Sequence, residues 1–257
     1  MQNQLTGLTY ALVSMIILIN IFGVAGASSE KEGSDSTIPL LDRQNHETIR
    51  TATFALGCFW GGDATYGAVP GVIRTRVGYA GGTMENPTYR DLGDHTESIQ
   101  VDYNPEVVSF EELVELFWEI HNPNSRGYST QYANILFYHN DNQKDIAERT
   151  KRELSRESEK EVFTRIKEIG EFYPAETYHQ KYRLRQSSPY IGIMKDIYPD
   201  PEDIRDSTAA ARLNGFLAGH GTPNQVSGLI GKLGLTRAAR DKLLKSFGMK
   251  GENISCG

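Results

Sequence analysis

The chain has 257 residues, of which 39% are hydrophobic, and this is enough to bury a substantial core. Its formal net charge of -6 disfavours a nucleic-acid partner, because such a partner is normally met by a basic protein face. The histidines are scattered and show no ligand spacing relative to the two cysteines, so we expect no metal and no other bound cofactor.

The N-terminus has the composition of a targeting segment. Residues 1–29 contain no Lys, Arg, Asp or Glu, and a long apolar run ends in the small residues Ala-Gly-Ala. This pattern predicts a signal peptide over residues 1–27, cleaved after Ala27, and a location in the secretory pathway or outside the cell. The alternative is an uncleaved membrane anchor over residues 8–27. If the leader is cleaved, we expect no stable membrane association.

After the leader, the polar residues 28–48 predict a disordered linker. Strands and helices are then predicted from alternating or β-compatible runs and from helical spacing, with a capping box at Ser109 and Glu112. The predicted strands are 51–56, 72–79, 97–103, 133–138 and 162–166, and the predicted helices are 59–69, 110–121 and 142–160. This order predicts an α+β fold, a two-layer split βαβ (ferredoxin-like) sandwich, over residues 49–190.

The character of the chain changes after about Ile191. Residues 200–211 and 236–247 predict short helices, and a Gly-rich segment separates them. We therefore expect residues 191–257 to form a helical extension that ends in a loose tail carrying Cys256.

The segment ALGCFWGG, residues 55–62, places Cys58 between a predicted strand and a predicted helix. Free N–H groups at a helix N-terminus stabilise a thiolate, so this position favours a reactive thiol. The glycines permit a tight turn and the close approach of a substrate. Two alternatives stay open: a small buried core cysteine, and a single structural disulfide between Cys58 and Cys256.

Several blocks of the chain resemble the A-type peptide methionine sulfoxide reductases, in a plant-like form with a secretory-type leader and a C-terminal extension. GCFWGG resembles the active-site signature of that family. Further blocks follow in family order: VGYAGG (77–82), NPTYRDL (86–92), GDHTESIQVDY (93–103), STQYANILFY (129–138) and FYPAETYHQKY (172–182). Several ordered blocks are far more specific than one motif, so the resemblance identifies residues 49–190 as the catalytic domain.

The resemblance implies a reaction on methionine S-sulfoxide, in oxidised proteins and as the free amino acid. Cys58 would attack the sulfoxide sulfur, release methionine and become a sulfenic acid. Glu97 would act as the acid that protonates the oxygen, because a buried carboxyl has a raised pKa. The substrate-binding residues implied by the same blocks are Phe59 and Trp60 for the S-methyl group and Tyr89 and Tyr132 for the oxygen.

The resemblance also implies that a second thiol resolves the sulfenic acid and that a thioredoxin-type dithiol then reduces the disulfide. Cys256 is the candidate, and an external thiol is the alternative. We expect His179 to support the site without reacting, and we expect a monomer. Residues 125–129 depart from the family pattern by lacking an Asp, which puts one polar contact near Glu97 in doubt. A rival hypothesis is a secreted non-catalytic module with a structural Cys58–Cys256 disulfide.

Overall fold

The computed structural model describes residues 38–158 and 160–249. The predicted signal peptide, the first part of the predicted linker and Cys256 lie outside these residues. Within the described ranges, no helix combines the length and the apolar character needed to span a membrane.

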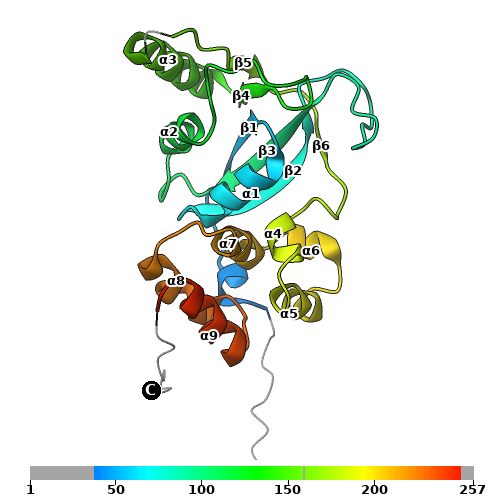
Figure 1. Cartoon of the computed structure of the whole chain (residues 1–257), viewed down its shortest axis with the longest axis vertical. Coiled ribbons are helices and arrows are strands. Elements are labelled where there is room, and N and C mark those ends of the chain that lie inside the picture. Colours follow the sequence, from blue (N-terminus) through cyan, green and yellow to red (C-terminus); the bar gives the residue numbers. More distant parts are fainter. Residues whose placement is uncertain (1–37, 159, 250–257) are drawn as a thin grey trace, which may run out of the picture. The chain divides into compact units, whose positions relative to one another are not determined.

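One six-stranded sheet holds together residues 50–174, which we call the sheet half (Figure 1). Its strands are β1 Arg50–Leu56, β2 Val72–Ala80, β3 Thr96–Tyr103, β4 Asn134–Tyr138, β5 Arg165–Glu168 and β6 Phe172–Pro174. They lie in the order β5-β4-β1-β3-β2-β6. Only the β4–β5 pair is parallel, and the other pairs are antiparallel. The fold is therefore mixed α/β, with its first four strands close to the predicted ranges.

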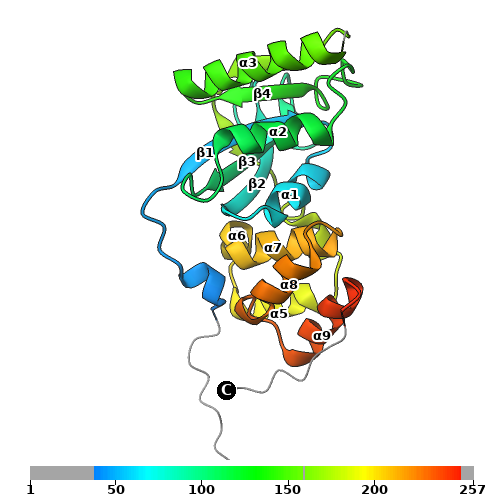
Figure 2. The ribbon, with the colours of Figure 1, turned by 90° about the vertical axis from the view of Figure 1, so that its left-hand side faces the viewer.

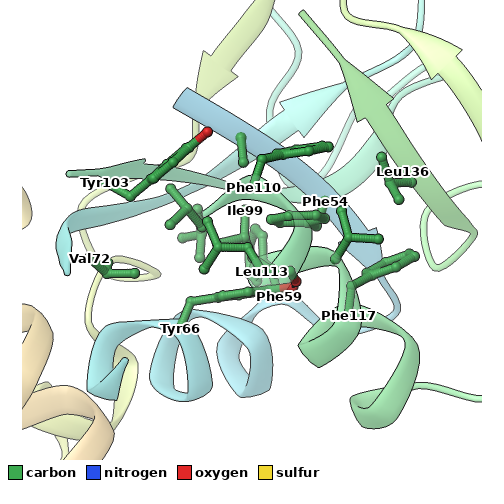
Figure 3. Packing of buried hydrophobic residues seen from close by; sticks show 14 of the residues in the cluster. Phe54, Phe59, Tyr66, Val72, Ile99, Tyr103, Phe110, Leu113, Phe117 and Leu136 are labelled. Carbon is green, nitrogen blue, oxygen red and sulfur yellow. The ribbon is translucent and has the colours of Figure 1, made fainter. Parts of the chain in front are cut away.

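Three helices cover this sheet: α1 Phe59–Ala68, α2 Phe110–Ile120 and α3 Asp141–Ser158 (Figure 2). The capping box that the sequence predicts at Ser109 and Glu112 is confirmed at the start of α2. The largest cluster of buried hydrophobic side chains lies between the sheet and α1 and α2 (Figure 3). Phe54 of β1 stacks on Tyr66 of α1 with ring centroids 4.9 Å apart. Tyr66 in turn donates its hydroxyl to the Leu113 carbonyl of α2, so both helices are fixed to β1.

The C-terminal residues form a helical extension with its own buried cluster. Its helices are α4 Tyr182–Arg185, α5 Tyr190–Ile197, α6 Pro201–Asp206, α7 Thr208–Leu217, α8 Pro223–Leu229 and α9 Arg237–Ser246. The single helix predicted over residues 200–211 is wrong, because the chain breaks at Ser207. The Ser207 hydroxyl accepts a hydrogen bond from the Ala210 N–H and so starts α7 as a new helix.

The described end of the predicted linker differs from the expectation of disorder. Leu40–Arg43 forms a short 3-10 helix, and Leu41 is only 6% exposed. Asp42 accepts hydrogen bonds from the N–H groups of Thr208 and Ala209 at the start of α7. Burial of Leu41 and this capping contact at a helix N-terminus tie the segment to the extension.

The extension packs on the sheet half through a contact between α7 and α1. A Cβ placed on Gly67 of α1 would lie 2.5 Å from the Ala211 carbonyl oxygen of α7, and one on Gly215 of α7 would lie 2.6 Å from the Ala64 carbonyl oxygen of α1. Glycine is therefore required on both helices for their backbones to approach this closely.

Gly67 and Gly228, each the second-to-last residue of its helix, give a matched test of the α1–α7 contact. Gly67→Ala should lower the free energy of unfolding by about 1–3 kcal/mol, because the new methyl group meets backbone. Gly228→Ala in α8 has open space within 4 Å and should raise it by about 0.4–1 kcal/mol. Urea unfolding of both variants measures the difference. Equal effects of the two substitutions would contradict the close α1–α7 contact.

Candidate active site

Cys58 is the N-cap residue of α1 and is exposed at the surface, although its surroundings partly shield the thiol from water. The preceding Gly57 has φ +87, in the left-handed region that disfavours residues with a Cβ, and this lets β1 turn directly into the helix. The sequence prediction of a thiol at a strand-to-helix turn is confirmed. Cys58 is the one cysteine within the described ranges, so its predicted contact with Cys256 stays a prediction.

The pKa of the Cys58 thiol is raised above its ordinary value. Partial burial is the largest cause, and the negative charge of Glu97 raises the pKa further. The backbone N–H groups of Trp60 and Gly61 and the charge of Arg183 lower it. The helix N-terminus therefore acts in the direction that the sequence analysis expects, but burial and Glu97 outweigh it.

Glu97 of β3 is 1% exposed and lies against the start of α1. Its Oε2 accepts a hydrogen bond of 3.1 Å from the Phe59 N–H, and its Oε1 accepts one of 2.8 Å from Nε2 of Gln131. Burial raises the pKa of the Glu97 carboxyl, and these two hydrogen bonds oppose the rise. Gln131 was not named as a site residue from the sequence. Its amide supplies a polar contact to Glu97, where the missing Asp of residues 125–129 had put one such contact in doubt.

Tyr89 and Tyr132 bring their hydroxyl groups together beside Glu97. A hydrogen bond with Tyr89 is the largest of the causes that raise the pKa of Tyr132 to about 12, and burial and the Glu97 charge add to it. The Tyr132 hydroxyl also accepts a hydrogen bond of 3.2 Å from Nε2 of Gln131. Two tyrosine hydroxyls and a buried carboxyl therefore occupy one small region next to the thiol.

Phe59 and Trp60 form the aromatic part of the site. Their ring centroids are 6.5 Å apart, and Phe59 is buried whereas Trp60 is partly exposed. Tyr182 of α4 stacks on Trp60 with centroids 3.7 Å apart and planes 5° apart. The indole Nε1–H of Trp60 donates to Nδ1 of His179 at 3.2 Å. His179 thus supports the site, as expected, while Tyr182 was missed although it lies in a block that resembles the family.

Glu176 is a third residue that sequence reasoning missed, after Gln131 and Tyr182. Its Oε1 accepts a hydrogen bond of 3.0 Å from the Tyr89 N–H, and its Oε2 accepts one of 2.6 Å from the Tyr79 hydroxyl. Although burial opposes it, these bonds hold the pKa of Glu176 below its ordinary value. Glu176 therefore positions Tyr89 as an ionised acceptor. The residues that the structure describes contain no cluster of His, Cys, Asp and Glu that could hold a metal ion.

Comparison with known proteins gives consistent matches. The family described as "Peptide methionine sulfoxide reductase" matches residues 50–208. A peptide methionine sulfoxide reductase of Drosophila melanogaster is 43% identical over 75% of this chain and 78% of its own length. The A5 protein of Oryza sativa subsp. japonica is 39% identical over 68% of this chain and 70% of its own. The crystal structure of reduced Mxr1 from Saccharomyces cerevisiae aligns with a TM-score of 0.51 and 30% identity, over 56% of this chain and 90% of that one.

The electrostatics of Cys58 predict opposite effects for two substitutions. Glu97→Gln removes a negative charge and should lower the pKa of the thiol, whereas Arg183→Gln removes a positive charge and should raise it. The measurement is the rate of iodoacetamide alkylation against pH, on a Cys256→Ser background so that only Cys58 reacts. Shifts in the same direction would contradict the assigned causes.

Proposed function

The chain belongs to the peptide methionine sulfoxide reductase family of oxidoreductases, and we propose that it reduces methionine S-sulfoxide to methionine through Cys58. The observation that carries the proposal is the Phe59–Glu97 hydrogen bond, which holds a buried carboxyl at the residue next to the thiol. The strand order β4-β1-β3-β2, with α1 after β1 and α2 after β3, supports our interpretation of the sheet half as a split βαβ sandwich.

In the proposed first step, the Cys58 sulfur bonds to the sulfoxide sulfur while the sulfur–oxygen bond breaks. The oxygen is a poor leaving group until it is protonated, and Glu97 supplies the proton because burial raises its pKa. The paired hydroxyls of Tyr89 and Tyr132 hold the same oxygen as fixed donors. In a second displacement, a water molecule attacks the Cys58 sulfur and the sulfur–sulfur bond breaks, so that methionine leaves, Cys58 becomes a sulfenic acid and the thiol is oxidised by two electrons.

The S-methyl group of the substrate is proposed to sit against Phe59 and Trp60. Stacking on Tyr182 and the hydrogen bond to His179 support this role, because they fix the indole in one orientation. A rigid apolar seat on one side and polar groups on the other distinguish the methyl group from the oxygen. This asymmetry supports selectivity for one epimer, and the family resemblance implies that it is the S epimer.

For the second step we propose that Cys256 attacks the sulfenic acid, releases water and forms a disulfide with Cys58. A thioredoxin-type dithiol then reduces that disulfide and restores both thiols. The support comes from the chain having only one other cysteine, in its C-terminal tail. An external thiol that attacks Cys58 directly is the competing route.

Two single substitutions separate these roles in an assay of methionine release from an S-sulfoxide peptide. Cys58→Ser should lose activity by about 10³-fold or more with either dithiothreitol or thioredoxin, because the nucleophile is gone. Cys256→Ser should keep its activity with dithiothreitol and lose the activity supported by thioredoxin.

Two results would contradict these assignments. Wild-type protein as inactive as Cys58→Ser with both reductants would overturn the enzymatic function and favour a module with a structural disulfide. Full thioredoxin-supported turnover by Cys256→Ser would overturn the resolving role alone.

A further inference from the structure

A pocket of about 430 Å³ opens beside Cys58, and we call it the side pocket. Its walls include Leu56 and Cys58 from the β1–α1 turn and His121, Tyr128 and Tyr132 from the segment between α2 and β4. Phe59 and Trp60 are not among its lining residues, so it is separate from the proposed seat of the S-methyl group. The reaction described above leaves this space without a role.

The side pocket has an uncharged wall. None of the residues that line it is Asp, Glu, Lys or Arg. His121 has both ring nitrogens in hydrogen-bonding contact, Nδ1 with the Phe117 carbonyl at 2.5 Å and Nε2 with the Thr164 hydroxyl at 2.9 Å. Burial lowers the pKa of His121, which keeps the ring neutral near pH 7. An anionic group would lose its hydration on entering this pocket without meeting a lysine or arginine on its wall.

Tyr128 stands at the rim of the side pocket and is 100% exposed. No described hydrogen bond or ring contact involves its side chain. An aromatic ring that stays fully in water beside a nucleophile gains buried area when an apolar group covers it. The full exposure of the Tyr128 ring therefore favours contact with a ligand over a structural role.

The backbone that carries Tyr128 is nevertheless held firmly. Nδ2 of Asn134 donates to the Asn122 carbonyl at 3.2 Å, and Nδ2 of Asn124 donates to the Glu161 carbonyl at 2.8 Å. Gly127 has φ +79, and a Cβ there would lie 2.7 Å from the Tyr132 carbonyl oxygen. The close approach to Tyr132 thus requires glycine at 127 and fixes the place from which the Tyr128 ring projects.

We propose that the side pocket binds the side chain two positions from methionine sulfoxide in an extended protein substrate and selects an apolar or aromatic residue there, with Tyr128 packing over it. The inference rests on the proposed function of Cys58. In an extended chain, side chains two residues apart lie on the same face, about 6.8 Å apart along its axis, and Cys58 itself lines the pocket. A peptide whose sulfoxide reaches Cys58 therefore brings the side chain two positions away to the pocket mouth.

The test uses three peptides with a central methionine S-sulfoxide whose residues two positions before and two positions after it are both Phe, both Ala or both Asp. Dithiothreitol is the reductant, so that binding of thioredoxin does not enter the comparison. The wild-type protein should show a kcat/KM for the Phe peptide about tenfold or more above that for the Asp peptide, with the Ala peptide between them.

Substitutions at Tyr128 then test the residue. Tyr128→Ala should bring the Phe-to-Ala ratio of kcat/KM close to one, and Tyr128→Phe should keep the wild-type ratio because it keeps the ring. Tyr178→Ala is the control. Tyr178 is also exposed, at 57%, but it packs on His179 and does not line the side pocket, so the ratio should stay as in wild type.

The possible failures are distinguishable. If wild-type protein reduces none of the three peptides, the proposed function is wrong and the subsite falls with it. If it reduces all three at one kcat/KM, or if Tyr128→Ala slows all three equally, the function stands and the subsite is overturned. A Tyr128→Ala defect confined to thioredoxin-supported turnover would also overturn the subsite, because it would place the C-terminal tail in the pocket.

Discussion

The hydrogen bond from the Phe59 N–H to Oε2 of Glu97 is the contact on which the rest of the site depends. It joins the first turn of α1 to β3 and satisfies one of the donors that a helix start leaves free. Because Phe59 follows Cys58 directly, the same bond fixes the distance between thiol and carboxyl. The two groups are also coupled in charge, since an ionised Glu97 raises the pKa of the thiol. Protonation of the carboxyl therefore favours the thiolate. The proposed reaction needs a protonated Glu97 and an ionised Cys58 at the same time.

The helical extension also contributes to this arrangement, through its contacts with α1. Asp63 of α1 is fully buried, and its carboxylate accepts hydrogen bonds from Lys181 and from Asn214 of α7. Burial lowers the pKa of Lys181, and the charge of Asp63 opposes this shift. The next residue, Tyr182, stacks on Trp60. One buried ion pair thus orients the helix that carries the nucleophile and also positions the aromatic wall of the site, so the extension is part of the catalytic unit.

Local signals in the sequence predicted the elements that depend on local interactions. The strand–glycine–helix turn at Gly57 and the capping box of α2 were both recognisable because their hydrogen bonds lie within a few residues. The short strand β6 was missed, since it has three residues and ends in a proline. The break at Ser207 was missed as well, because it depends on the capping of α7 and on Asp42 from far away in the chain.

The site shows the same difference between features that are visible locally in the sequence and contacts that depend on the fold. Cys58, Glu97 and the two tyrosines were recognised from blocks that resemble a family. Gln131 and Glu176 lie in such blocks as well, but their contacts with Glu97 and Tyr89 are visible only in the fold. The direction of the Cys58 pKa shift follows the same rule. A helix N-terminus is visible in sequence and lowers the pKa, but burial and the facing Glu97 are tertiary effects and determine the net rise.

The central claim, that Glu97 delivers the proton while Cys58 is a thiolate, is tested most directly by single-turnover methionine release against pH in the Cys256→Ser protein. No reductant is needed for this step. With Glu97 present, the rate should stay level between the raised pKa of Glu97 and the raised pKa of Cys58, because the fraction with a protonated carboxyl and an ionised thiol is constant there. With Glu97→Gln added, the rate should be lower by about 10²-fold or more and should climb with pH until the thiol has ionised. Parallel profiles for the two proteins would contradict the account.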